Sequence, residues 1–467
     1  MWRESNIEKT RTYNRQRNLK LKNLPNTLTE EEWMNTLKEF EYRCAYCGEH
    51  LELEKDHFIP VSKDGGYTVD NIVPSCITCN RSKYNYDFFE WYPTYEFYDK
   101  GRETNILNYL GYIKQIKKEN KMKLFSNEIV FRGHPDKVCD QISDAILDEC
   151  LRQDKYSRVA VETMGGKGKI FVTGEITTNA KLDVEQIIKG VLVDIGYSAD
   201  EYEIINNIGK QSSDIALGVD IGGAGDQGMM FGYACNDTEE LLPLAQVILQ
   251  RLSKEYFKLT KMFGDFLPDG KAQITGYYDD DFKLTKIKTF TISYQNTETD
   301  RKITDGLLKK IAINICKFYD IEVEEFLINP TGKFLIGGFE GDAGLTGRKI
   351  VVDTYHSFAN VGGGAFSGKD YTKVDRSGAY KARQLAIRYL KKHNLKWCEV
   401  QISYAIGKAE PLAIYIDSDK GNFEPTLELY EECKPLNIVK DLNLLNCNYK
   451  KTAMFGHFGN KDFAWEN

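Results

Sequence analysis

Two pairs of cysteines near the N-terminus have the spacing of a metal site. The first pair is Cys44 and Cys47, the second is Cys76 and Cys79, and 28 residues separate the pairs. A two-residue spacer in a turn lets both thiolates of a pair face one ion, so the pairs can converge on a single tetrahedral Zn²⁺. Zinc held by four cysteines has no open position. We therefore expect a structural Zn²⁺ here, with the chemistry coming from other residues.

Polar residues that suit attack on a phosphodiester lie among these cysteines. Asp56 and His57 stand between the pairs, Asn71 belongs to an Asp-Asn dipeptide, and Asn80 directly follows the last cysteine. Imidazole titrates near neutral pH and can take a proton from water, and a hard cation such as Mg²⁺ binds carboxylate and amide oxygens. A lone histidine is more often structural, but these neighbours favour metal-assisted hydrolysis.

The order of these residues resembles the HNH endonucleases. The shared pattern covers residues 44–83 and reads Cys-x-x-Cys, Asp-His, Gly-Gly, Asp-Asn and Cys-x-x-Cys-Asn-x-x-Lys. The resemblance implies DNA as a partner and four roles: His57 as the general base, Asp56 and Asn80 as ligands of a catalytic Mg²⁺, and Asn71 as the residue that orients the histidine. Two alternatives stay open, an inactive remnant that only binds nucleic acid and a mobile-element fusion whose main activity is DNA cleavage.

A second group of motifs, far downstream, suits the handling of a polyphosphate. Residues 133–137 read Gly-His-Pro-Asp-Lys, and residues 362–370 read Gly-Gly-Gly-Ala-Phe-Ser-Gly-Lys-Asp. The second stretch is not a true P-loop, because Asp370 stands where such a loop needs Ser or Thr to hold magnesium. Glycines let a backbone approach phosphate, and lysines and carboxylates supply counter-charge and Mg²⁺ ligands. A Gly-rich stretch alone also fits a tight structural turn. The neighbouring motifs are therefore needed to choose between a turn and a phosphate-binding segment.

Those neighbours follow in order along the chain and include Gly-Glu-Ile-Thr-Thr at 174–178, Gly-Leu-Thr-Gly-Arg-Lys at 344–349 and Gly-His-Phe-Gly at 456–459. Together the motifs resemble S-adenosylmethionine synthetase over residues 123–466. The resemblance implies that the sulfur of L-methionine attacks C5′ of ATP, with release of pyrophosphate and phosphate. It also implies Mg²⁺ and K⁺ as cofactors, three α/β subdomains around a pseudo-threefold axis, and a homodimer or homotetramer with shared active sites.

The same resemblance assigns roles to single residues. The residues implied around the triphosphate are His134, Lys271, Arg348, Lys349, Lys369 and Lys373. The implied metal ligands are Asp136 and Asp375 for Mg²⁺ and Glu162 for K⁺. The implied methionine-binding residues are Glu175, Gln211 and Asp342, and those beside adenosine are Asp269 and Phe334. Several cations on one polyanionic leaving group make physical sense, because the thioether sulfur carries no proton for a base to remove.

Three features depart from the family pattern. Phe131 and Arg132 replace the usual Ser-Glu, which puts a cation in place of a carboxylate at the edge of the nucleotide site and predicts altered substrate affinity. The loop at 212–225 is shorter than the usual bacterial version, which puts the rate in question because loop closure often sets turnover. Ala343 stands where many relatives have cysteine, a change that removes only a thiol.

Composition divides the chain into two domains that must position these residues. A chain of 467 residues, 42% hydrophobic and 28% charged, is too long for one core. Residues 1–121 hold 19 basic and 19 acidic side chains, so the net charge of −7 belongs to the remainder. With this division, the two resemblances imply a zinc-containing ββα-metal domain at 1–121 and a three-subdomain enzyme at 122–467, of mixed α/β (α+β) class.

Hydrophobic periodicity predicts the main elements of both domains. Strand-like runs lie at 169–178 and 398–406, helical patterns lie near 183–195, 238–256, 303–319 and 376–392, and an apolar run of roughly helical spacing lies at 106–114. The basic residues within 1–22 fit either phosphate contact or a solvated tail. We expect no membrane association and a cytoplasmic protein, because there is no apolar run of about 18 residues and no signal-peptide core.

Overall fold

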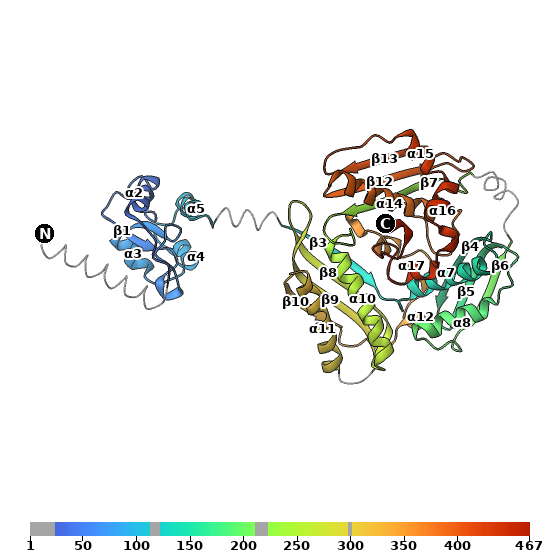
Figure 1. Cartoon of the computed structure of the whole chain (residues 1–467). Helices are drawn as coiled ribbons and strands as arrows, with labels where there is room; N and C mark the ends of the chain where they lie inside the picture. The colour runs from blue at the N-terminus through green and yellow to red at the C-terminus, as the bar shows by residue number, and fades with distance from the viewer. Residues whose placement is uncertain (1–23, 113–121, 211–222, 298–300) are drawn as a thin grey trace. The chain divides into compact units, whose positions relative to one another are not determined.

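The computed structural model describes residues 24–112, 122–210, 223–297 and 301–467 (Figure 1). The chain divides into two compact units, Met1–Met122 and Lys123–Asn467. Three predicted features lie outside the described residues: the basic segment 1–22, Gln211 and most of the loop 212–225. No helix in the described ranges is long and apolar enough to cross a membrane.

The N-terminal unit is built around a β-hairpin followed directly by a helix. Its elements are α2 (Glu30–Glu39), β1 (Leu53–His57), β2 (Ile72–Cys76), α3 (Ile77–Lys83), α4 (Phe88–Trp91) and α5 (Lys100–Tyr109). Strands β1 and β2 pair antiparallel, with Asp56 opposite Val73 and His57 opposite Ile72. The hairpin and α3 together give the predicted ββα arrangement.

An aromatic core supports this hairpin and helix. Phe58 lies next to His57 in the chain and packs on Phe88, with ring centroids 4.6 Å apart, and Tyr46 packs edge-on against Trp91. The predicted helical run at 106–114 falls at the end of α5. That helix begins earlier, after Asp99, because the Asp99 carboxylate caps it by accepting the N–H of Arg102.

The C-terminal unit contains three β-sheets, each packed against helices. The first sheet, in the order β10-β9-β8-β3, has strands Val323–Ile328, Leu284–Asn296, Phe266–Tyr278 and Lys123–Val130. The second, β11-β4-β5-β6, has strands Gly344–Leu345, Arg158–Gly166, Lys169–Thr177 and Glu203–Gly209. The third, β13-β12-β7, has strands Ala413–Ser418, Trp397–Tyr404 and Gly228–Cys235. These sheets and their helices confirm the predicted mixed α/β class (Figure 1).

Each sheet packs against long helices of its own. The long helices are α7 (Pro135–Gln153) and α8 (Val184–Ile195), α10 (Leu244–Met262) and α11 (Arg301–Phe318), and α14 (Val374–His393). Helix α7 contacts β4, α10 contacts β3 and β8, and α14 contacts β7 and β12. Two large apolar clusters result, one between α10, α11 and the first sheet and one spanning the other two sheets.

Most of the predicted elements agree with the structure, and one helix start is wrong. The predicted helix at 238–256 begins only at Leu244, after Pro243. The residue before a proline is disfavoured in the helical conformation, and Leu241 has a positive φ of 55°, so the chain cannot be helical through this point. The hydroxyl of Thr238 instead accepts the N–H of Leu242 and closes a turn ahead of the helix.

Strand β3 opens the C-terminal unit and lies at the edge of its sheet. Its first residue, Lys123, pairs with Tyr278 of β8, and β8 is its neighbour on one side. At its far end β3 leads through residues 131–134 into α7, whose first residue is Pro135. Proline suits this first helical position because its fixed φ is already helical and no N–H is needed there.

Candidate active sites

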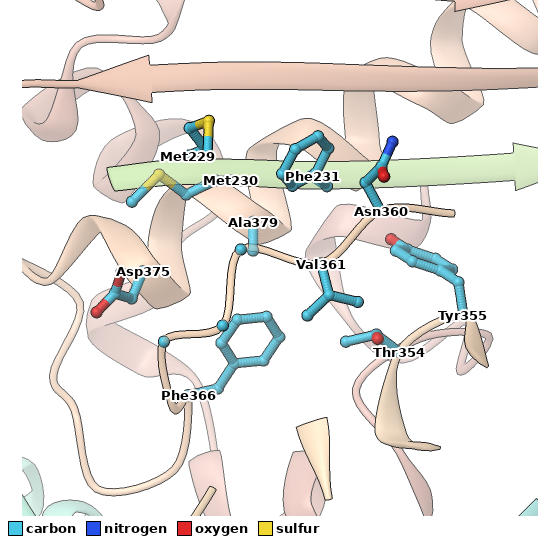
Figure 2. Close-up of a pocket in the computed structure, with 13 residues that line it drawn as sticks. Met229, Met230, Phe231, Thr354, Tyr355, Asn360, Val361, Phe366, Asp375 and Ala379 are labelled. Carbon is cyan, nitrogen blue, oxygen red and sulfur yellow. The ribbon is translucent and has the colours of Figure 1, made fainter. Parts of the chain in front are cut away.

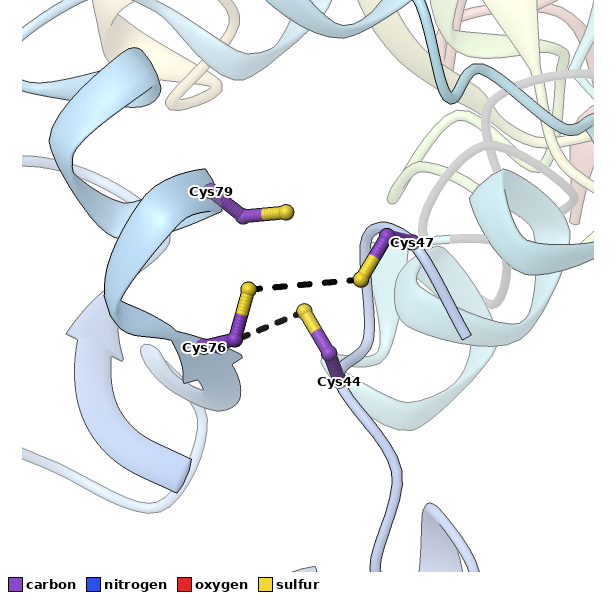
Figure 3. A group of neighbouring side chains, drawn as sticks. All are labelled: Cys44, Cys47, Cys76 and Cys79. Atoms are coloured by element: carbon purple, nitrogen blue, oxygen red, sulfur yellow. Dashed lines mark hydrogen bonds between the residues drawn. The ribbon is translucent and has the colours of Figure 1, made fainter. Parts of the chain in front are cut away.

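The four predicted zinc ligands meet at one point (Figure 3). The Sγ atoms of Cys44, Cys47, Cys76 and Cys79 all lie within 4.8 Å of one another, and the Cys47 and Cys76 sulfurs are 4.0 Å apart. Four thiolates at about 2.3 Å from a tetrahedral Zn²⁺ would stand about 3.8 Å from one another, so the group fits that ion. A hydrogen bond from Cys79 lowers the pKa of the Cys44 thiol to about 4, whereas burial raises the pKa of the Cys47 thiol to about 11.

The predicted nuclease residues are carried by the hairpin and by α3. Asp56 and His57 are the last two residues of β1 and are both buried, and Asn80 lies in the middle of α3. The backbone of His57 is fixed through its carbonyl oxygen, which accepts a hydrogen bond of 2.5 Å from the Nζ of Lys83. The His57 ring packs against the ring of Tyr67, with centroids 5.6 Å apart.

Asn71 braces the loop that leaves β1. Its side chain accepts the N–H of Ile59 at 2.7 Å and donates to the carbonyl oxygens of Ile59 and Gly66, and its own carbonyl accepts the N–H of Phe58. Gly65 packs so tightly under this loop that an added Cβ would stand 1.8 Å from the Ile59 oxygen. Asn71 therefore fixes the backbone that follows His57.

Two residues without a predicted role hold the Asp56 carboxylate. The Tyr46 hydroxyl donates to Asp56 Oδ2 at 2.7 Å, and Lys83 Nζ lies 3.3 Å from the same oxygen. Both side chains are fully buried, and burial beside the carboxylate raises the pKa of Tyr46 well above its usual value. Lys83 was visible in the sequence as the last residue of the Cys-x-x-Cys-Asn-x-x-Lys pattern, whereas nothing in the sequence pointed to Tyr46.

In the C-terminal unit, a first group of predicted residues gathers around Asp136 at the start of α7. The His134 side chain caps this helix by accepting the N–H of Asp136. The Asp136 carboxylate accepts the N–H of Leu345 at 3.0 Å, and Lys349 Nζ and Arg348 Nε lie 2.6 and 3.6 Å from its oxygens. Loop 345–349 and the N-terminus of α7 thus bring two cations to one buried carboxylate.

Lys271, Asp269 and Asp342 adjoin this first group. Burial and the charges of Lys349 and Lys271 lower the pKa of His134 to about 4, so its ring is neutral at neutral pH. Burial raises the pKa of Asp269 to about 6, and the N–H of Gly338 donates to it at 2.8 Å. The charge of Asp342 raises the pKa of Asp269 further, and the charge of Lys271 lowers it.

A second group surrounds the Gly-rich segment and the start of α14, and Figure 2 shows the pocket beside it. Lys369 forms an ion pair with Asp375, and Lys373 forms one with Asp370 at 2.5 Å. Asp375 lies at a pocket that Met229, Met230 and residues 360–364 also line. Gly364 sits directly on Asp375, since a Cβ there would approach its carboxylate carbon to 2.5 Å. Among the described residues, no hydrogen bond or ion pair joins the side chains of this group to the first.

Three predicted residues stand apart from both groups. Glu162 is an exposed residue of β4 opposite Thr173, and Glu175 lies on β5 between Ala160 of β4 and Gly209 of β6. Phe334 is half-buried, and its carbonyl accepts the N–H of Asn296. In the described part of the chain, none of the three hydrogen-bonds to either group.

Arg132 has a structural setting that its position in the sequence did not indicate. Its guanidinium is buried, donates to Gln141 at 2.6 Å and to Asp194 at 2.5 Å, and lies 4.5 Å from the ring of Phe257. Phe131, its neighbour, is fully buried and stacks on Tyr256. The two departures from the family pattern are therefore built into the packing between α7, α8 and α10.

Buried ion pairs that the sequence did not predict lie beneath both groups. Lys137 Nζ lies 2.5 Å from Asp353, and Arg376 holds Asp144 through two nitrogens at 2.6 and 2.8 Å. Asp144 also accepts the N–H of Gly368 and so connects α7 to the Gly-rich segment. Lys137 belongs to the Gly-His-Pro-Asp-Lys motif, but Asp353 and Arg376, which pair with Lys137 and Asp144, lie more than 200 positions away from them.

The fold and these groups define a two-part protein, a ββα nuclease-type domain with a four-cysteine group that could hold a metal, joined to a unit that pairs lysines with carboxylates around a glycine-rich segment. The N-terminal, central and C-terminal domain models of S-adenosylmethionine synthetase match residues 122–213, 221–334 and 336–467, and the HNH endonuclease model matches residues 44–86. The chain therefore belongs to the S-adenosylmethionine synthetases and carries an HNH endonuclease domain ahead of all three synthetase domains. Both predicted resemblances are confirmed.

Proposed function

We propose that residues 122–467 synthesise S-adenosylmethionine from ATP and L-methionine. The observation that carries the proposal is the pairing of Asp136 with Lys349 and of Asp375 with Lys369 inside the matched synthetase domains. The methionine sulfur forms a bond to C5′ of ATP while the bond from C5′ to oxygen breaks. The triphosphate leaves with that electron pair, and water then splits it into pyrophosphate and phosphate.

The two pairs can exchange partners when nucleotide binds. Each lysine offers its cation to the triphosphate, and each aspartate then offers its carboxylate to a Mg²⁺, so neither charge is left uncompensated. Mg²⁺ bound there would neutralise charge on the departing triphosphate. Arg348, Lys271 and Lys373 supply further cations for the same polyanion. Glu162 would bind K⁺, and Glu175, Gln211 and Asp342 would bind methionine, with Asp269 and Phe334 beside adenosine.

His134 acts as a neutral hydrogen-bond donor in this proposal. With its pKa near 4 the ring carries no charge at neutral pH before substrate binds. A neutral imidazole can still donate one N–H to a phosphate oxygen. A bound polyanion stabilises the protonated ring, so the pKa of His134 rises as the site fills.

We further propose a homodimer or homotetramer in which each active site uses residues of two chains. The proposal is supported by the family to which the chain belongs and by the lack, among the described residues, of a hydrogen bond or ion pair between the side chains of the two groups. A mixture of the Asp136→Asn and Lys369→Ala variants tests it, since subunit exchange would rebuild one intact site in each mixed dimer. Recovered synthesis after mixing is expected, and no recovery despite exchange would count against shared sites.

Purified protein, ATP, L-methionine, Mg²⁺ and K⁺ provide the direct test of the synthetase. We expect S-adenosylmethionine by mass spectrometry, with one pyrophosphate and one phosphate per product. The Lys369→Ala variant serves as the matched control, because it alters one charge in the second group and none in the first. Failure of wild type to form product with both cations present would refute the proposal. We expect the activity in the cytoplasm, where synthetases of this family typically act.

We propose a second activity, metal-dependent DNA cleavage by residues 1–121. The supporting observation is the placement of Asp56, His57 and Asn80 on a hairpin and helix joined by the four-cysteine group. In this proposal His57 takes a proton from water, and Asp56 and Asn80 would hold a Mg²⁺, which would supply positive charge to stabilise the phosphate. Asn71 keeps the backbone after His57 in place. The four cysteines would hold a structural Zn²⁺.

Supercoiled DNA with Mg²⁺ tests this second activity. Nicked or linear product from wild type, and none from His57→Ala, would establish a bifunctional enzyme. If neither protein cuts while both bind DNA and zinc, the domain is an inactive binding remnant. If neither protein cuts or binds DNA, the proposed role of the domain in acting on DNA is refuted.

A further inference from the structure

Strand β1 and helix α3 are joined by two side-chain links that keep the same order along both elements. Asn80 Nδ2 donates to Glu54 Oε2 at 3.1 Å, and Lys83 Nζ lies 3.3 Å from Asp56 Oδ2. Glu54 and Asp56 are two residues apart and so project from one face of the strand. Asn80 and Lys83 are three apart and so lie on one face of the helix. One face of α3 is therefore matched to one face of β1.

The hydrogen bond to Glu54 fixes the orientation of the Asn80 side-chain amide, with its nitrogen toward Glu54. A carboxamide has one end that donates, the NH₂, and one that accepts, the oxygen. Since a carboxylate can only accept from it, Glu54 holds the nitrogen end of Asn80. The oxygen of Asn80 is then the atom that this residue presents elsewhere, and oxygen is the atom that a hard cation binds.

We propose that Glu54 is a positioning residue for the metal site of the HNH domain, holding the Asn80 amide so that its oxygen serves as the ligand. This inference rests on the nuclease activity proposed above. It extends that proposal to a residue that the Asp-His and Cys-x-x-Cys-Asn pattern does not include. Lys83 and Tyr46 hold Asp56, and Glu54 holds Asn80, so each oxygen ligand has its own orienting partner. Loss of such a partner typically weakens metal binding 10- to 100-fold.

A matched pair of substitutions separates positioning from charge. Glu54→Ala removes the acceptor, and the Asn80 amide is then free to turn its nitrogen toward the cation. Glu54→Gln removes the negative charge but keeps an oxygen that can accept from Asn80. If Glu54 positions Asn80, the glutamine variant behaves like wild type and the alanine variant does not. If Glu54 acts by its charge alone, both variants fail to the same degree.

Mn²⁺ binding to the full-length protein, followed by electron paramagnetic resonance of the free ion, gives a readout that needs no DNA cleavage. The Asp56→Asn variant serves as the reference, because the synthetase sites are the same in both proteins and cancel in the difference. We expect one site lost in Asp56→Asn, a 10-fold or greater weakening of that site in Glu54→Ala, and less than a threefold change in Glu54→Gln. The Mn²⁺ concentration that half-saturates DNA cutting should shift in parallel.

The outcomes are distinct. A Glu54→Ala protein that binds Mn²⁺ as tightly as wild type, or equal weakening in both Glu54 variants, would overturn the positioning role alone. Wild type that binds no more Mn²⁺ than Asp56→Asn would overturn the metal site itself, and the inference with it. Zinc content and S-adenosylmethionine synthesis should be unchanged throughout. If the Glu54→Ala protein loses zinc, the Glu54→Val variant is measured in its place, because valine suits a strand.

Discussion

Replacing Cys76 by serine should unfold the N-terminal unit and leave the synthetase intact. Cys76 ends β2, immediately precedes α3, and donates its backbone N–H to the Cys44 sulfur at 3.3 Å. It therefore connects the hairpin, the helix and the first cysteine pair. Loss of one thiolate leaves three ligands for the ion and removes the tie between these elements.

The expected size of the effect follows from the size of the unit. Residues 24–112 of this unit, 89 in number, imply a total stability of about 4–13 kcal/mol at about 0.05–0.15 kcal/mol per residue. A structural Zn²⁺ contributes about 10–16 kcal/mol in small zinc domains. The free energy contributed by zinc is as large as the total free energy of unfolding of the unit. Loss of the zinc should therefore leave the unit unfolded at room temperature. The synthetase has separate apolar clusters and should keep its own stability.

Calorimetry and zinc analysis provide the assay. Wild type should show two unfolding transitions and one Zn²⁺ per chain, whereas Cys76→Ser should lose the zinc and one transition while S-adenosylmethionine synthesis continues. Cys447→Ser is the matched control, because Cys447 is a half-buried cysteine outside the four-cysteine group. A Cys76→Ser protein that keeps its full zinc content and both transitions would refute the reasoning.

Three further predictions concern the C-terminal unit. Lys369→Ala should lower the synthesis rate about 10²- to 10³-fold without loss of fold, as removal of one preorganised donor typically does; a rate near wild type would contradict its role. His134 binds a proton less readily in the folded protein than in the unfolded chain. Its neutral ring therefore contributes at most about 3 kcal/mol to the free energy of unfolding above pH 6.5, and this contribution is lost as the pH falls toward 4. His134→Asn should therefore flatten the pH dependence of the melting temperature in that window, and an unchanged slope would exclude the low pKa. Arg132→Met should cost about 2 kcal/mol of stability through lost hydrogen bonds and the contact with Phe257, while the KM for ATP changes less than twofold; a large KM change with unaltered stability would instead place Arg132 at the nucleotide.

Local patterns were sufficient to predict the elements and the four-cysteine group. The helices near 183–195 and 376–392 and the strands at 169–178 and 398–406 agree with α8, α14, β5 and β12 because their apolar periodicity matches the faces that they bury. The cysteines converge as predicted because each pair shares one turn. The start of α10 was wrong because a proline and a left-handed residue overrode a helical pattern.

Contacts between distant segments could not be predicted from the sequence. Tyr46 reaches Asp56 across the start of the hairpin, and Asn80 reaches Glu54 over 26 positions. Arg132 was expected at the nucleotide site because only its position in a motif was visible. Its partner Asp194 lies 62 positions away on α8, and only the folded packing brings that carboxylate to the guanidinium.

The edge position of β3 bears on how such a two-part gene can arise. The strand begins at Lys123 and, among the described strands, pairs only with β8, so the polypeptide enters the synthetase unit along an outer strand of its first sheet. Coding sequence added or deleted directly before this point leaves the register of β3 on β8 unchanged, because that pairing starts at Lys123. This position should therefore tolerate gene fusion. Recombination there can join another reading frame to the gene of this enzyme without compensating changes in the enzyme itself.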